Sequence, residues 1–175
     1  MERAPESQWI ADFGCGSGCI GLSLLKEIPG SRLIAVDRSK VAAEVTRENS
    51  IKLNLLERVE VVEQSVENWN APRMLDLIVM NPPYIAEGDV RVQASVHTFE
   101  PHEALYAADE GLAAIAAWTR KAWATLRPSG AVVLEIGSGQ SGRVQEIMRQ
   151  TGFREIQIAR DLNGIERVIS GNKPE

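Results

Sequence analysis

Segments rich in apolar and β-branched residues alternate with segments of helical periodicity along most of this chain of 175 residues. In the helical segments apolar residues recur every three or four positions, as in Ile115, Trp118, Ala122 and Leu126. Such alternation is typical of a parallel sheet covered by helices on both faces. It predicts an α/β fold in a single domain, because 175 residues suffice for one sizeable core.

The pattern predicts seven strands and four crossover helices. The strands are expected at about Gln8 to Phe13, Arg32 to Val36, Val59 to Glu63, Leu75 to Met80, Ala131 to Ile136, Arg154 to Ala159 and Glu166 to Ser170. The helices are expected at Cys19 to Glu27, Lys40 to Leu53, Leu112 to Leu126 and Gly142 to Gln150. Only six residues separate the last two strands, too few for a helical crossover, so these strands should form an antiparallel hairpin.

Residues 84–111 are the one long stretch without clear periodicity. A connection of this length in a compact domain is usually functional. Because it follows a polar motif at a strand end, we expect it to cover a substrate.

A glycine-rich loop follows the first predicted strand and opens the first predicted helix. It reads Asp12-Phe13-Gly14-Cys15-Gly16-Ser17-Gly18. Its glycines allow the backbone to approach a ligand at the positive end of the helix. The Gly-x-Gly-x-Gly spacing differs from the Gly-x-Gly-x-x-Gly fingerprint of dinucleotide sites. The loop therefore predicts a cofactor site contributed by Asp12, Gly14, Cys15, Gly16, Ser17 and Gly18.

Asp37 ends the second predicted strand. A carboxylate at this place can accept hydrogen bonds from both hydroxyls of a ribose. The alternative is that Asp37 caps the helix that begins near Ser39, and the two roles are compatible.

The tetrapeptide Asn81-Pro82-Pro83-Tyr84 directly follows the fourth predicted strand. Two prolines fix two φ angles and leave their carbonyls as acceptors beside an Asn side chain that both accepts and donates. Tyr84 offers a flat face against which an amide or a base could lie. The motif predicts a site that holds a planar NH₂ group, although a simple strand-ending turn would use the same residue types.

The loop, the ribose carboxylate and the amide-binding strand end together favour an adenosyl cofactor without phosphates. The loop has no Lys or Arg, and the chain lacks the Gly-Lys-Ser/Thr sequence of a nucleotide-hydrolysing P-loop. S-adenosylmethionine fits best, with S-adenosylhomocysteine as its product.

Charge and metal-ligand residues narrow the possible partners. A net charge of −5 disfavours extensive binding to nucleic-acid backbones. Cys15 and Cys19 are expected to be structural, and His97 and His102 have no partners at metal-ligand spacing, so no metal is expected. No stretch has the length and apolarity of a signal core or a membrane span, so we expect a cytoplasmic protein.

The motifs resemble the class I S-adenosylmethionine-dependent methyltransferases and, among them, the HemK/PrmC family of peptide-chain release factor glutamine N5-methyltransferases. The glycine loop, Asp37 and the Asn-Pro-Pro-Tyr motif occur in that order in the family. The carboxy-terminal half is similar as well, in the segments Phe99-Glu100-Pro101, Ala107 to Leu112, Leu134 to Gly137 and Asp161 to Val168.

The resemblance implies a Rossmann-like fold and methyl transfer to the side-chain amide nitrogen of the glutamine in the Gly-Gly-Gln motif of a bacterial class 1 release factor. It implies that Asn81, Pro82, Pro83 and Tyr84 act in catalysis, with Asn81 also next to the cofactor. Together with Phe99, Glu100 and Pro101 they would bind the substrate. No nucleophilic or metal constellation is required.

The chain departs from the family in two places. Val66 stands where the family has an acidic residue at the adenine edge, so Glu67 and Trp69 are expected to supply the adenine contacts. The family also has an amino-terminal helical domain, whereas this chain starts a few residues before the first strand, so we expect a truncated domain or a minimal variant.

Two other functions remain open. The Asn-Pro-Pro-Tyr motif is also similar to adenine-N6 methyltransferases, which need a flipped base and a basic surface. A domain that binds cofactor or release factor without turnover is the third hypothesis, motivated by Val66 and by the missing amino-terminal domain.

Overall fold

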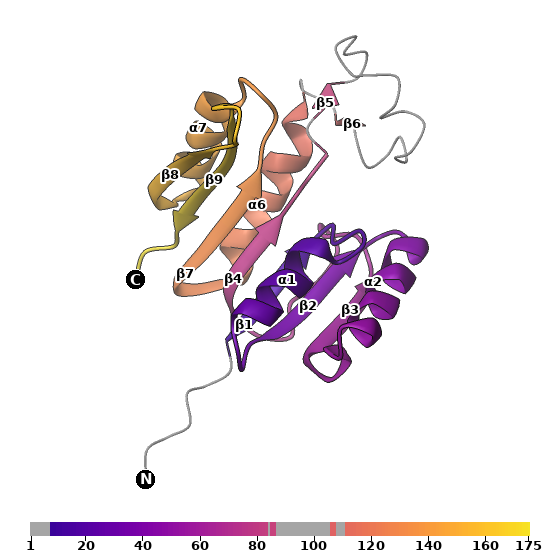
Figure 1. Cartoon of the computed structure of the whole chain (residues 1–175). Coiled ribbons are helices and arrows are strands. Elements are labelled where there is room, and N and C mark those ends of the chain that lie inside the picture. The colour runs from indigo at the N-terminus through magenta and orange to yellow at the C-terminus, as the bar shows by residue number, and fades with distance from the viewer. Residues whose placement is uncertain (1–7, 84, 87–105, 108–110) are drawn as a thin grey trace.

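The computed structural model describes residues 8–83, 85–86, 106–107 and 111–175 (Figure 1). Its helices are α1 (Cys19–Glu27), α2 (Lys40–Lys52), the short 3₁₀ helix η1 (Leu56–Arg58), α6 (Ala113–Thr125) and α7 (Ser141–Thr151). The strands of the main sheet are β1 (Trp9–Phe13), β2 (Arg32–Asp37), β3 (Val59–Glu63), β4 (Leu75–Met80), β7 (Leu126–Glu135), β8 (Arg154–Arg160) and β9 (Glu166–Asn172). Two further short strands, β5 (Ile85–Ala86) and β6 (Tyr106–Ala107), pair with each other.

The main sheet has seven strands in the order β3-β2-β1-β4-β7-β9-β8. All neighbours from β3 to β7 pair in parallel, and β9 runs antiparallel to both β7 and β8. The predicted α/β fold with a carboxy-terminal antiparallel hairpin is therefore confirmed. The chain moves outward in one direction from β1 to β3 and in the other from β4 to β8, so β1 and β4 flank the point where the topology switches.

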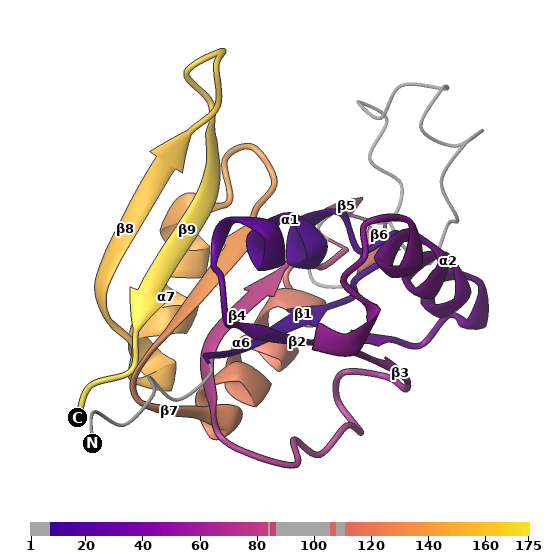
Figure 2. The same cartoon turned by 60° about the horizontal axis from the view of Figure 1, so that its bottom comes forward.

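Helices cover both faces of this sheet (Figures 1 and 2). Alternate β1 residues point to opposite faces of the sheet, so they belong to two separate hydrophobic cores, one on each face. Ile10 packs with Leu22 and Leu25 of α1, whereas Ala11 and Phe13 pack with residues of α6 and α7. The α6 side holds the larger core, which reaches from Ile34 of β2 to Ile169 of β9.

The amino-terminal part of β7 was not predicted. Arg127-Pro128-Ser129-Gly130 has the composition of a turn, so the strand was expected to begin at Ala131. In the structure the strand starts at Leu126, and its pairing with β4 shifts register between Leu75 and Leu77, as at a β-bulge. Ser129 lies at the irregularity with a φ of 62° and donates its backbone N–H to the carbonyl of Lys173.

None of the helices in the described residues could cross a membrane. The longest of them, α2 and α6, have 13 residues each, fewer than the ~20 that a span requires.

Candidate active site at the carboxyl edge of the sheet

The strand register brings the predicted site residues to one edge of the sheet. Phe13 of β1 pairs with Val36 of β2 on one side and with Met80 of β4 on the other. The residues that follow these three are Gly14, Asp37 and Asn81, so all three lie at the carboxyl edge. Ligands of open α/β sheets bind at this edge beside the switch point, which here lies between β1 and β4.

The glycine loop leaves β1 in a left-handed conformation. Gly14 and Gly16 have φ angles of 68° and 55°, which favour glycine. The N–H groups of Gly14 and Cys15 both donate to the carbonyl of Val36, which ties the loop to the neighbouring strand. No heavy atom lies within 4 Å of the place where a Cβ of Gly16 would project, so this part of the loop faces open space.

Two side chains of α2 hold the loop from the other side. Thr46 donates its hydroxyl to the carbonyl of Gly16 at 2.9 Å, and Asn49 donates its side-chain amide to the carbonyl of Ser17 at 2.9 Å. Neither residue was predicted from the sequence. Thr46 and Asn49 are three residues apart, which places them on one face of the predicted helix. This spacing does not indicate that the face contacts a loop 30 residues earlier in the chain.

Asp37 is half-buried, and both of its carboxylate oxygens accept backbone hydrogen bonds. Oδ2 accepts from the N–H of Gly16 at 2.9 Å and Oδ1 from the N–H of Ser39 at 2.8 Å. Ser39 itself is the N-cap of α2, and its hydroxyl accepts from Ala42. Asp37 therefore organises the loop and the helix start. A carboxylate has about four acceptor positions, which leaves capacity for ribose hydroxyls.

Asp12 lies beneath the loop and is 2% exposed. Its Oδ2 accepts the N–H of Gly21 at 2.9 Å, which fixes α1 against β1. Burial raises the pKa of this carboxyl from 3.8 to about 7; the Gly21 hydrogen bond lowers it, and the charge of Asp37 raises it further. Asp12 therefore changes its protonation near neutral pH.

The two cysteines have different environments. Cys15 is 7% exposed, and burial raises the pKa of its thiol to about 12, so it stays protonated. Its Sγ lies 3.5 Å from the Thr46 hydroxyl. Cys15 thus has the structural role predicted for it beside its place in the cofactor loop. Cys19 is exposed at the start of α1, so the structural role expected for both cysteines is supported by burial only at Cys15.

At the end of β4, Asn81 is exposed, Pro82 is buried and Pro83 is half-buried. Asn81 thus presents its side chain at the edge where the glycine loop begins. The other residues predicted for the substrate side, Tyr84, Phe99, Glu100 and Pro101, lie outside the described residues.

In the turn after β3, Glu67 and Trp69 have different environments. Glu67 is exposed at this edge, and its Oε1 accepts the indole N–H of Trp118 at 2.8 Å. Trp69 is 3% exposed, and its ring packs edge-on against Phe13, with 5.7 Å between centroids. Because the core encloses Trp69, the predicted adenine contact rests on Glu67 alone, and it stays a prediction. Val66 is buried in the same core.

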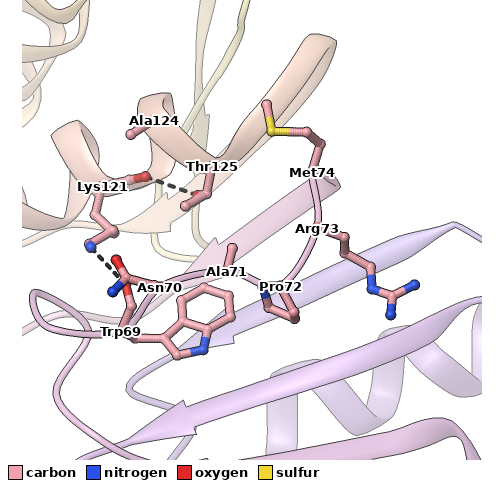
Figure 3. Close-up of a pocket in the computed structure, with 9 residues that line it drawn as sticks. All are labelled: Trp69, Asn70, Ala71, Pro72, Arg73, Met74, Lys121, Ala124 and Thr125. Atoms are coloured by element: carbon pink, nitrogen blue, oxygen red, sulfur yellow. Dashed lines mark hydrogen bonds between the residues drawn. The ribbon is translucent and has the colours of Figure 1, made fainter.

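A hollow of about 360 Å³ lies away from this edge (Figure 3). It is lined by Trp69, Asn70, Ala71, Pro72, Arg73, Met74, Lys121, Ala124 and Thr125. Arg73 and Met74 precede β4 whereas Asn81 follows it, so the six-residue strand, roughly 20 Å long, lies between this end of the hollow and Asn81. Within the described residues no three His, Cys, Asp or Glu side chains are grouped as a metal ion would require.

The chain is similar in sequence to known methyltransferases. The family model described as methyltransferase small domain matches residues 1–107. The chain is 38% identical over 168 residues to a release factor glutamine methyltransferase of Cereibacter sphaeroides, covering 94% of this chain and 59% of that protein. It is 37% identical over 162 residues to a bifunctional methyltransferase of Rickettsia typhi, covering 91% and 31%. It thus spans about three fifths of the first relative and about a third of the second.

A solved structure supports the fold. The S-adenosylmethionine-dependent O-methyltransferase of Thermotoga maritima superposes with a TM-score of 0.72 at 14% identity, covering 97% of this chain and 60% of that one. At this identity the similarity concerns the fold, which is that of a class I methyltransferase.

Proposed function

Because the chain belongs to the methyltransferase small domain family, we propose that it transfers a methyl group from S-adenosylmethionine to the side-chain amide nitrogen of a glutamine in a release factor. The observation that carries the proposal is the position of Asn81-Pro82-Pro83 beside the glycine loop at the switch point of the sheet. The resemblance to release factor glutamine methyltransferases supplies the substrate class.

The described residues fit the cofactor. The backbone at Gly16 faces open space, and Asp37 lies against it with acceptor capacity for two ribose hydroxyls. Glu67, exposed after β3, would be the acceptor on the adenine side. When bound, S-adenosylmethionine supplies an electrophilic methyl group on a sulfonium.

The chain's own residues would position the substrate nitrogen. An amide nitrogen is a weak nucleophile because its lone pair is delocalised into the carbonyl. Asn81 Oδ1 and the carbonyl of Pro82 would accept the two N–H groups of the glutamine amide and direct its nitrogen toward the methyl carbon. Transfer would form the N–C bond while the S–C bond of the donor broke, and the electron pair of that bond would stay on sulfur. The nitrogen then releases its surplus proton to solvent.

The experiment combines this protein with S-adenosylmethionine and a purified class 1 release factor. Mass analysis of the peptide that contains Gly-Gly-Gln should reveal one added methyl group on the glutamine. A release factor with Gln→Asn at this position is the matched control and should stay unmodified. Methylation of an adenine-containing oligonucleotide in place of the release factor would contradict the proposal, and so would cofactor binding without any transfer.

A further inference from the structure

The indole of Trp118 lies against the first glycine of the loop. Trp118 is on α6, and its ring packs edge-on against Phe13, with 6.5 Å between centroids. A Cβ added to Gly14 would come within 2.6 Å of the Trp118 ring, closer than real Cβ contacts allow. The ring therefore supports the backbone at the point where the loop leaves β1.

The other side of the same indole reaches the turn after β3. Its Nε1–H donates to Glu67 Oε1 at 2.8 Å. Glu67 is exposed, and an exposed Glu without a fixed partner would populate many rotamers, which opposes binding through lost entropy. The hydrogen bond holds this carboxylate at the carboxyl edge before a ligand arrives.

We propose that Trp118 is a positioning residue of the cofactor site, which fixes the Glu67 carboxylate to receive the exocyclic amine of adenine and keeps Gly14 in place. The inference rests on the proposed function. One indole thereby joins two segments of the site that are far apart in sequence. The Trp118 hydrogen bond uses one acceptor position of the carboxylate, so others remain for the adenine N–H.

Trp123 provides a matched control on the same helix. Its ring lies against Gly152, where an added Cβ would come within 2.7 Å of it, and it packs edge-on against Phe153 with 5.1 Å between centroids. Both tryptophans thus fill the space beside a glycine of positive φ and contact a buried phenylalanine. Only Trp118 touches the carboxyl edge, so a purely structural role would affect the two variants alike.

The test is a titration with S-adenosylhomocysteine and with S-inosylhomocysteine, whose base has a carbonyl in place of the adenine amine. The parent should prefer the adenosyl compound. Trp118→Phe removes the indole donor. It should lower the affinity for the adenosyl compound three- to tenfold, as expected for the loss of one hydrogen bond, and should reduce the preference for this compound over the inosyl compound. Trp123→Phe should keep the affinity and the preference of the parent.

Glu67→Ala keeps the Trp118 ring and changes an exposed side chain, so it tests the inference even if Trp118→Phe does not fold. It should abolish the preference, and adding Trp118→Phe to it should cause no further loss. An unchanged preference in Glu67→Ala, or an unchanged affinity in a folded Trp118→Phe, would overturn the inference and leave the proposed function intact. A parent that binds neither compound would instead overturn the proposed function.

Discussion

At the scale of single residues, Asn81 and Asp37 divide the proposed work between substrate and cofactor. Asn81 is exposed after β4, and no described backbone group depends on it, whereas Asp37 accepts hydrogen bonds from Gly16 and Ser39. Asp37 ends β2 and Asn81 follows β4, and these two strands flank β1. Their substitutions should therefore affect different steps.

Asn81→Ala should lower methyl transfer to the release factor by about 100-fold or more while the dissociation constant of S-adenosylmethionine stays within a few-fold, because the lost contacts go mainly to the substrate amide. Single-turnover transfer and calorimetric titration measure the two quantities. Asp37→Ala is the comparison and should weaken cofactor binding at least tenfold. Transfer at the parent rate in Asn81→Ala would remove the catalytic assignment.

Asp12 makes the stability of the ligand-free protein depend on pH. The folded protein keeps the Asp12 proton up to about pH 7, whereas the unfolded chain loses it near pH 3.8. Between these values the folded state binds more protons, so the free energy of unfolding falls as pH rises through 7. The charged form is disfavoured by burial, and the loss is ~4 kcal/mol at most.

Asp12→Asn should remove this dependence, since the Asn side-chain oxygen can still accept the Gly21 N–H without carrying charge. Urea unfolding at pH 5 and pH 8 measures it. The variant should be more stable than the parent at pH 8, with a smaller difference at pH 5. Parallel pH profiles for the two proteins would mean that the Asp12 carboxyl has an ordinary pKa.

At the scale of elements, periodicity predicted every helix that borders the site to within about two residues. The bounds of α1 agree with the prediction, and α6 differs from it by one residue at each end. A helix that buries one face has apolar residues every three or four positions, so the local sequence pattern indicates which residues are buried. The pattern could not report the contacts of Thr46, Asn49 or Trp118, because these depend on where the loop lies in space.

The same limit explains why the burial of Trp69 was not expected and why the predicted start of β7 was wrong. Trp69 is near the predicted site in sequence, but the turn at Ser65 directs its ring into the core. No feature of the sequence distinguishes such a buried tryptophan from an exposed one. The 127–130 segment has turn composition, yet β7 continues through it as a bulged strand. β4 pairs with β7 on both sides of the segment, and Ser129 and Gly130 form backbone hydrogen bonds with Lys173. In both cases a tertiary contact outweighs a local preference.

Helix α6 also carries a polar group in its buried face that lacks a partner in the described part of the chain. The hydroxyl of Thr119 is fully buried and accepts or donates no hydrogen bond among the described residues, and an unsatisfied buried hydroxyl destabilises a folded protein by about 1–3 kcal/mol. Thr119→Val replaces the hydroxyl by a methyl group of similar size and should raise the free energy of unfolding by about 1 kcal/mol. Urea denaturation measures the change.

Thr125 supplies the control for this prediction. It is also buried on α6, but its hydroxyl donates to the carbonyl of Lys121 at 2.9 Å. Thr125→Val should therefore be neutral or destabilising. If Thr119→Val destabilises the protein as well, the Thr119 hydroxyl has a partner in solution.

At the scale of the whole molecule, one core joins the strands β1 and β2, from which the cofactor loop and Asp37 extend, to the helices and strands from α6 onward. The larger core contains residues of β1 and β2, of α6, and of β7, α7 and β9. Trp69, Trp118 and Trp123 all lie in this core or pack against it. The proposed cofactor contacts come from β1, β2 and the turn after β3, but Trp118 connects them to α6.

The described elements should therefore unfold as one cooperative unit, as a single domain would. Tryptophan fluorescence and far-ultraviolet circular dichroism should give coincident urea transitions. S-adenosylhomocysteine at 100 times its dissociation constant should stabilise the protein by about 2.7 kcal/mol and shift both transitions equally, because the folded state alone binds it. Two separate transitions, of which the ligand moves only one, would mean that the cofactor loop and the carboxy-terminal hairpin belong to independently folding units.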